Sequence, residues 1–393
     1  MIYNFDQVIE RRGSGCFKWD TGAPDVLPMW VADMDFQIAE PIKEALHLRT
    51  DHGIFGYSVQ GESYYEAAMG WFKRRHGWTI RREWFSLCPG IVPALHFLAK
   101  AYCKPGDKIM MHSPVYYPFF EAAESNGVGV VNNYLLNING RYEIDFDNFE
   151  AIAKDPHVKL FFLCSPHNPG GRIWTKDELT KMGRICLEND VIVVSDEIHC
   201  DLIYSGKQFV AFGTLPEDIV KNSIICVAPS KTFNLAGLQT SCLIIPDEEI
   251  KAAYDKYLGS LGIMRPNAYG IAGLKAAYNH GDEWVDQLME YLKGNLDYLK
   301  AYVAENLPYI KIMEPDATYL IWMDFSALGM DPEELHNLIL EKGKLWLDQG
   351  YMFGKSGEGF ERINIACPRS VLEDGLKRLS AALEGISAKE KND

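Results

Sequence analysis

Four residues that could bind a cofactor each follow a short apolar run in the middle of the chain. They are Gly90 in a Pro-Gly pair, Asn168 between two prolines, Asp196 and Lys231. If the runs are strands of one open parallel sheet, these residues meet at its carboxyl edge, where such sheets bind ligands. A helix start, an amide, a carboxylate and an amine together suit a phosphorylated, cationic cofactor that carries a carbonyl group.

Lys231 is the residue with the clearest chemical use. A lysine that directly follows a buried strand has a lowered pKa, because burial penalises the ammonium form. A neutral amine forms a Schiff base with an aldehyde. Ser230 beside it, with Ala236 and Gly237 just after, favours a tight phosphate-lined pocket. The alternative is a surface lysine on a loop, which position alone does not exclude.

Asp196 and the Gly90 turn have cofactor interpretations as well. A carboxylate against a pyridine nitrogen keeps that nitrogen protonated, so that the ring withdraws electrons. The alternative for Asp196 is an N-cap. Gly90, with the amides of Ile91 and Val92, could hold a phosphate at a helix N-terminus. The alternative is an ordinary Pro-Gly turn.

Three further residues are candidates with common structural alternatives. Asn168 could donate to a ring hydroxyl, although asparagines in turns are frequent. His199 could approach the same hydroxyl, although a lone histidine is more often structural. Arg369 could bind a substrate carboxylate with its planar fork. The alternative is a surface arginine at a helix start, where the helix dipole disfavours a cation.

The elements that must position these residues read as an α/β domain. Apolar runs alternate with amphipathic helical stretches such as Val92–Cys103 and Thr175–Glu188. This alternation indicates a mostly parallel sheet covered on both faces. The expected strands are Trp84–Cys88, Lys108–His112, Val128–Val131, Val158–Cys164, Val191–Ser195, Ile224–Ala228 and Ser241–Ile245.

The remainder of the chain predicts a smaller α+β domain. We expect residues 49–282 to form the large domain and residues 283–393 the small one, which residues 1–48 join. The small domain should begin with a helix over Trp284–Glu305 and a hairpin-like segment over Ile310–Phe325. A helix over Pro332–Glu341, a strand over Arg362–Ala366 and a final helix over Val371–Leu383 should follow. The polar tail, residues 387–393, should fray.

Composition excludes several classes of partner. The 393 residues carry a formal net charge of -15 without a basic cluster, so we expect neither nucleic acid nor an anionic membrane as a partner. The nine cysteines are scattered and lack a C-x-x-C pair, which argues against a disulfide framework or a metal site. No apolar run approaches the ~18 residues of a membrane span, and we expect a cytoplasmic protein.

Several motifs resemble one enzyme family. Ser165–Gly171, Ser195–His199 and Ala228–Asn234 resemble the cofactor motifs of fold-type I pyridoxal-phosphate (PLP) enzymes of the class I/II aminotransferase group, with matching order across roughly residues 30–370. Four other segments resemble its cystathionine β-lyase or C–S lyase branch, also called MalY/PatB-like. They are Met29–Phe36, Phe55–Tyr57, Ser113–Phe119 and Asn364–Arg369.

This resemblance implies a role for each candidate. Lys231 would bind PLP covalently, Asp196 would pair with the pyridinium nitrogen, and Asn168, with His199 nearby, would reach the ring hydroxyl. Tyr116 would stack on the ring. The phosphate would be held by Gly90, Ile91, Val92, Ser230 and Tyr57, the last from the second subunit of a homodimer. Substrate would meet Arg369, Tyr117, Trp30 and Ala32, with Tyr351 shaping the pocket. Gln239 stands where many aminotransferases have arginine, as the lyase branch commonly does.

The reaction that the resemblance implies is α,β-elimination of L-cystathionine or related S-substituted cysteines to pyruvate, ammonia and a thiol. Lys231 would remove the Cα proton, and Tyr116, Tyr117 and Tyr57 are alternatives for protonating the leaving thiolate. One rival is a PLP-dependent aminotransferase, which shares the site. A second is a catalytically silent PLP-fold protein that acts as a binding module, although binding alone would not need Lys231, Asp196 and Arg369 together.

Overall fold

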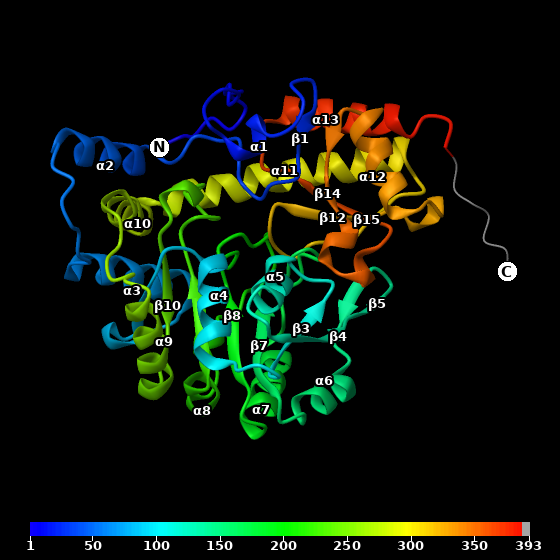
Figure 1. The fold of residues 1–393 in the computed structure, drawn as a ribbon. Helices are drawn as coiled ribbons and strands as arrows, with labels where there is room; N and C mark the ends of the chain where they lie inside the picture. Colours follow the sequence, from blue (N-terminus) through cyan, green and yellow to red (C-terminus); the bar gives the residue numbers. More distant parts are fainter. Residues whose placement is uncertain (387–393) are drawn as a thin grey trace.

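The computed structural model describes residues 1–386, and the tail expected to fray, residues 387–393, lies outside the described residues. A seven-stranded sheet forms the centre of the larger part (Figure 1). Each predicted strand exists there, with its bounds shifted by at most a few residues. The strands are β2 Phe85–Cys88, β3 Lys108–Ser113, β4 Gly129–Tyr134, β7 Val158–Cys164, β8 Ile192–Asp196, β9 Ser223–Val227 and β10 Ser241–Ile244.

The sheet is mixed, in the order β2-β10-β9-β8-β7-β3-β4. β10 is antiparallel to both of its neighbours, whereas the pairs from β9 through β4 are parallel. β2, β7, β8 and β9 therefore run in the same direction, and their carboxyl ends share one edge. The predicted α/β fold class, a mostly parallel mixed sheet, is confirmed.

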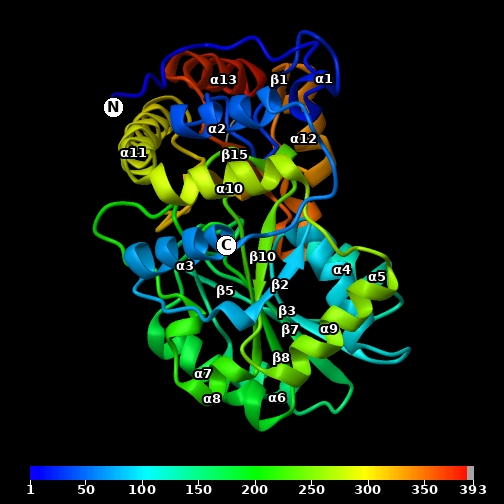
Figure 2. The ribbon, with the colours of Figure 1, turned by 90° about the vertical axis from the view of Figure 1, so that its left-hand side faces the viewer.

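Helices cover both faces of this sheet (Figure 2). α4, α5 and α9 pack on one face, where the apolar side chains of α4 interdigitate with the sheet. The other face carries α3, α6, α7 and α8. In α7 a capping box between Thr175 and Glu178 fixes the helix start. The bounds are α3 Glu62–His76, α4 Ile91–Tyr102, α5 Pro118–Glu124, α6 Phe146–Ala153, α7 Lys176–Glu188, α8 Glu217–Lys221 and α9 Glu248–Ser260.

A second, four-stranded sheet has the order β11-β12-β15-β14. It contains the predicted hairpin, and the long helices α11 and α13 pack against each other beside it (Figure 1). Its elements are α11 Asp282–Asn306, β11 Lys311–Ile312, β12 Leu320–Asp324, α12 Pro332–Glu341, β14 Asp348–Gln349, β15 Phe360–Asn364 and α13 Arg369–Ala382.

The N-terminal segment joins this second part of the molecule, because β1 pairs in parallel with β13. The domain boundaries after residues 48 and 282 stay a prediction. Within residues 1–386, no helix has the length and apolar character that crossing a membrane requires. The remaining elements are α1 Phe17–Asp20, β1 Leu27–Pro28, α2 Glu40–Asp51, β5 Leu136–Ile138, β6 Arg141–Glu143, α10 Ala268–His280 and β13 Leu345–Trp346.

Candidate active site

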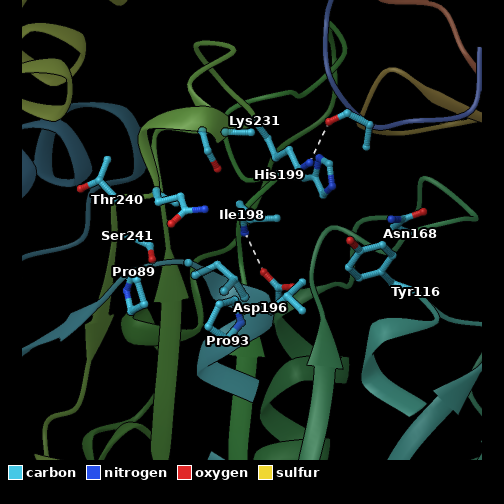
Figure 3. A pocket seen from close by; sticks show the side chains of 18 of the residues that line it. Pro89, Pro93, Tyr116, Asn168, Asp196, Ile198, His199, Lys231, Thr240 and Ser241 are labelled. Carbon is cyan, nitrogen blue, oxygen red and sulfur yellow. Dashed lines mark hydrogen bonds between the residues drawn. The ribbon is translucent and has the colours of Figure 1, made fainter. Parts of the chain in front are cut away.

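A cavity of about 240 Å³ lies at the sheet edge where β2, β7, β8 and β9 end (Figure 3). The ends of these strands and the turns that follow them supply its lining, as the sequence predicts. Most of the predicted cofactor residues line it together, with Ala32 from the predicted substrate residues: Gly90, Ile91, Val92, Tyr116, Asn168, Asp196, His199, Ser230 and Lys231.

Lys231 projects into the cavity from the turn after β9. Its Nζ donates a hydrogen bond to the Ala32 carbonyl oxygen at 2.7 Å. Burial lowers the pKa of the Lys231 amine to about 8, and the nearby Asp33 carboxylate opposes this effect. Near neutral pH the amine therefore exchanges readily between its charged form and the nucleophilic neutral form.

Asp196 ends β8 on the floor of the cavity and accepts a hydrogen bond from the Ile198 amide at 3.2 Å. Burial raises the pKa of Asp196 to about 7. Among residues 1–386, the Lys231 amine is the one charged group that lowers this pKa, and a protonated pyridine ring placed against Asp196 would supply a second cation.

We predict a specific pH dependence of stability for the cofactor-free protein. Between about pH 4, where an unfolded aspartate titrates, and about pH 7, folded Asp196 keeps a proton that the unfolded chain has released. Folding then takes up a proton, so the contribution of Asp196 to stability falls as pH rises through this window and is constant above it. The Asp196→Asn side chain does not titrate in this range, so the stability of this variant lacks this pH-dependent contribution.

The melting temperature of Asp196→Asn, minus that of the wild type, should therefore rise between pH 5 and pH 7.5 and then level off. Scanning calorimetry of both cofactor-free proteins measures the two melting temperatures. The underlying pH-dependent change in unfolding free energy is at most about 4 kcal/mol for a pKa shift of this size. A difference that does not change with pH would contradict the assignment.

The other end of the cavity is suited to a phosphate. α4 begins at Gly90, and no side chain in the described part of the chain caps its first turn, so its amides are available to an anion. Ser230, Gln239 and Thr240 also line this end. The hydroxyl of Thr240 was missed by the sequence interpretation, and its place directly before β10 was the available signal.

Asn168, Tyr116 and His199 form one side of the cavity (Figure 3). The Tyr116 amide donates to the Asn168 carbonyl oxygen at 3.1 Å, which ties the two residues together. Within residues 1–386, the buried Nδ1 of His199 has no hydrogen-bond partner. Burial holds the pKa of His199 well below its ordinary value. A neutral imidazole therefore faces the space where a ligand oxygen would lie.

Arg362 is the charged residue near the cavity that the sequence interpretation missed. It lies buried in β15, and its NH1 donates to Asn168 Oδ1 at 2.8 Å. Its NH2 donates to the Trp30 carbonyl at 3.0 Å and forms an ion pair with Asp348. Its charge also contributes to the lowered pKa of Lys231. An arginine at the start of the predicted strand Arg362–Ala366 was the signal.

Arg369, the predicted carboxylate ligand, is not brought to the cavity. Its Nε donates to Asn295 Oδ1 at 2.9 Å, and its guanidinium lies over the Tyr298 ring at 4.8 Å from the centroid. It opens α13, whose start faces α11 rather than the sheet edge. Sequence spacing alone could not separate it from Arg362, which lies seven positions earlier.

The other predicted residues lie around the cavity or away from it. Tyr117 packs against Tyr116 with ring centroids 5.4 Å apart. The Trp30 ring stacks on Trp346 at 4.7 Å, so its contact with Arg362 is through the backbone. Tyr351 lies in a short 3-10 helix and is partly buried. Tyr57 is 97% exposed and lies outside its own chain's cavity.

A possible metal cluster is occupied by protein hydrogen bonds. Within residues 1–386, His76, Cys200 and Asp201 lie close enough together to hold an ion. However, the Asp201 carboxylate already accepts hydrogen bonds from Trp71, Thr232 and the His76 ring. These contacts brace the turn that carries Lys231, and they leave Asp201 without an oxygen to offer to a metal.

Comparisons with known proteins agree with this geometry. The family described as aminotransferase class I and II matches residues 24–379. Cystathionine beta-lyase PatB of Bacillus subtilis is 46% identical over 97% of this chain and 100% of its own length. The structure of cystalysin from Treponema denticola, which contains a pyridoxal 5'-phosphate cofactor, has a TM-score of 0.95 at 37% identity and covers 98% of this chain and 99% of its own. The PLP-bound C–S lyase of Staphylococcus hominis has a TM-score of 0.91 at 34% identity, covering 98% and 99%.

Proposed function

Because this chain belongs to the aminotransferase class I and II family, we propose that it is a PLP-dependent carbon–sulfur β-lyase of the cystathionine β-lyase type. It eliminates the sulfur substituent from L-cystathionine or related S-substituted cysteines and yields pyruvate, ammonia and a thiol. The observation that carries the proposal is the cavity itself, which brings a buried amine and a buried carboxylate together with the start of helix α4.

The residues present fit PLP at both ends. Asp196 suits its ring nitrogen, His199 and the Asn168 amide suit its ring oxygen, and the start of α4 with Ser230 suits its phosphate. Lys231 is the residue that would carry it. When bound, PLP supplies an electron-withdrawing ring that acidifies the Cα proton of an attached amino acid.

Proton handling is the part of the reaction that belongs to the chain. Lys231, with its lowered pKa, accepts the Cα proton from the substrate and becomes an ammonium ion. The leaving thiolate needs a proton, and Tyr116, whose side chain lines the cavity, is the residue that would supply it. Burial raises the pKa of Tyr116, so its hydroxyl is protonated near neutral pH and has a proton to donate.

Arg362 takes the role first predicted for Arg369 and binds the substrate α-carboxylate. Asp348 and the Trp30 carbonyl fix one edge of the guanidinium, and the Asn168 oxygen accepts from the other. Because Asn168 uses its oxygen for Arg362, its NH₂ group can donate toward the cofactor. One arginine thus orients both the substrate and the amide.

The experiment is an assay for pyruvate with purified protein, PLP and L-cystathionine, without any keto acid. The protein should absorb visible light, lose the band on borohydride reduction and release pyruvate. Turnover that begins only after a keto acid is added would make it an aminotransferase. A protein that takes up no PLP would refute the proposal and leave the silent binding module as its rival. A cytoplasmic location stays a prediction.

We further propose a homodimer in which Tyr57 completes the phosphate site of the partner subunit. Large apolar side chains are exposed on the segment around Tyr57 and on the nearby turn before α10. They are Leu48, Ile54, Phe55, Val59 and Met264, with 53% to 78% of each side chain accessible. A second copy of this chain would cover this surface and place Tyr57 at a cavity.

Tyr57→Phe should therefore weaken PLP binding by about tenfold, the loss expected when one hydrogen bond to a charged group is removed. Titration of cofactor-free protein with PLP, followed by visible absorbance, measures the change, and sedimentation velocity measures the dimer. The control is Tyr134→Phe, which removes another exposed hydroxyl. A monomeric protein with unchanged PLP affinity in Tyr57→Phe would contradict the proposal.

A further inference from the structure

Residues 29–36 cross the edge of the cavity between β1 and α2 without regular secondary structure. Ala32, in this segment, lines the cavity. Its carbonyl oxygen accepts from Lys231 Nζ at 2.7 Å and from the Tyr319 hydroxyl at 3.0 Å. The position of this one oxygen therefore determines where the free ε-amino group of Lys231 lies.

Two asparagines hold the backbone on either side of that carbonyl. Asn364 Nδ2 donates to the carbonyl oxygens of Val31 and Asp33, both at 2.6 Å. Asn234 accepts from the Met34 amide at 3.0 Å and donates to the Met34 carbonyl at 2.9 Å. Since Asn234 belongs to the same turn as the cavity lysine, the segment and that turn are tied directly to each other.

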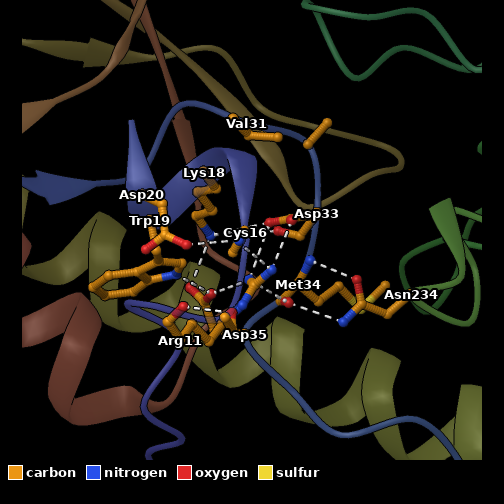
Figure 4. Close-up of polar contacts among 12 residues, drawn as sticks. Arg11, Cys16, Lys18, Trp19, Asp20, Val31, Asp33, Met34, Asp35 and Asn234 are labelled. Carbon is orange, nitrogen blue, oxygen red and sulfur yellow. Dashed lines mark hydrogen bonds and ion pairs between the residues drawn. The ribbon is translucent and has the colours of Figure 1, made fainter. Parts of the chain in front are cut away.

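A buried group of ion pairs anchors the same segment from its far side (Figure 4). Arg11 pairs with Asp33 at 2.9 Å and with Asp35 at 2.5 Å, and Lys18 pairs with Asp35 at 2.8 Å. The Trp19 indole also donates to Asp35, at 2.7 Å. The Lys18 side chain is 1% exposed and that of Asp35 is 7% exposed. We call Arg11, Lys18, Asp33 and Asp35 the N-terminal ion cluster.

Stability alone is a weak reason for such a cluster, because desolvation of buried charges largely offsets their attraction. What buried, hydrogen-bonded charges do provide is a fixed geometry. Arg11 NH1 also donates to the Met34 carbonyl at 3.0 Å, and Asp33 directly follows Ala32. The cluster therefore fixes the backbone one to three residues from the oxygen that Lys231 contacts.

We propose that the N-terminal ion cluster is a set of positioning residues for the reaction: it fixes the Ala32 carbonyl so that Lys231, when free, is held at that oxygen with its nitrogen lone pair directed at the substrate. This inference rests on the proposed function of Lys231 as the base. The proton moves from Cα to Nζ, and the N–H···O=C hydrogen bond to Ala32 persists in both protonation states.

The test compares Lys18→Met and Asp35→Asn with the wild type. We expect kcat to fall about tenfold, as small misplacements of a reacting group do, while KM changes by less than about twofold. The primary isotope effect with Cα-deuterated S-methyl-L-cysteine should increase, because proton transfer becomes slower. Lys18→Arg, which keeps the cation, should restore most of the rate.

A second readout uses the cofactor-free protein. Acetic anhydride labelling of Lys231, followed by peptide mass spectrometry, should be about threefold faster in both variants, because an amine without a fixed acceptor is more accessible. The control is Lys300→Met, which removes an exposed pair with Glu314 at 2.6 Å and should change none of these quantities.

Failure of this inference and failure of the proposed function are distinguishable. If the wild type releases no pyruvate, the proposed function fails, and the labelling comparison still tests the positioning. If both variants melt earlier but keep the wild-type kcat, isotope effect and labelling rate, the cluster is purely structural and the inference is overturned. Should Lys18→Met not fold, Asp35→Asn, which keeps the side-chain shape, carries the comparison.

Discussion

Replacing Lys231 with alanine should lower kcat for pyruvate release by about 10³-fold or more, since the variant loses both the cofactor attachment and the base that removes the Cα proton. The visible band of the covalently attached cofactor should also be absent. The fold should survive, because the change removes a buried amine rather than a packing group. The Ala32 carbonyl also keeps its hydrogen bond from Tyr319.

Steady-state assay, absorbance spectra and a melting curve of the same preparation check this expectation. Added methylamine should restore part of the rate, because a small free amine can enter the vacated space and accept the proton. A Lys231→Ala protein that keeps wild-type turnover would show that another group acts as the base, and His199 would then be the first residue to examine.

Replacing Arg362 should have the second largest effect and should distinguish it from Arg369. Arg362→Lys keeps a charge near Asp348 but loses the planar fork that joins Asn168 to the substrate carboxylate, so kcat/KM should fall by about 10²-fold. Arg369→Lys should stay within about threefold of the wild type, because that side chain contacts Asn295 and Tyr298 away from the cavity.

The first measurement is kcat/KM for S-methyl-L-cysteine. The second is the inhibition constant of the analogue of S-methyl-L-cysteine that lacks the carboxylate. The wild type and Arg369→Lys should bind the compound with the carboxylate much more tightly than the analogue without it. Arg362→Lys should show only a small difference between the two compounds. If Arg369→Lys loses activity and Arg362→Lys does not, the role of carboxylate ligand returns to the residue that the sequence first suggested. Arg362→Met is less informative, because it would leave Asp348 buried without its partner.

The sequence by itself determined the sheet and the residues at its edge. Apolar runs such as Val158–Cys164 and Val191–Ser195 cannot be exposed on either face, so they form central strands in a two-sided layer. Once β7, β8 and β9 run in parallel, Asn168, Asp196 and Lys231 must emerge at one edge. Their chemistry could therefore be inferred from residue type and local position alone, and the cavity contains all three.

Tertiary structure decided which residues from distant segments reach that edge. Arg362 and Arg369 lie on the same stretch of chain, and only the pairing of β15 with β12 and β14 turns Arg362 toward Asn168. The contact between the Ala32 carbonyl and Lys231 joins residues 199 positions apart. Such contacts depend on how two sheets and an irregular segment pack, and local periodicity does not encode that packing.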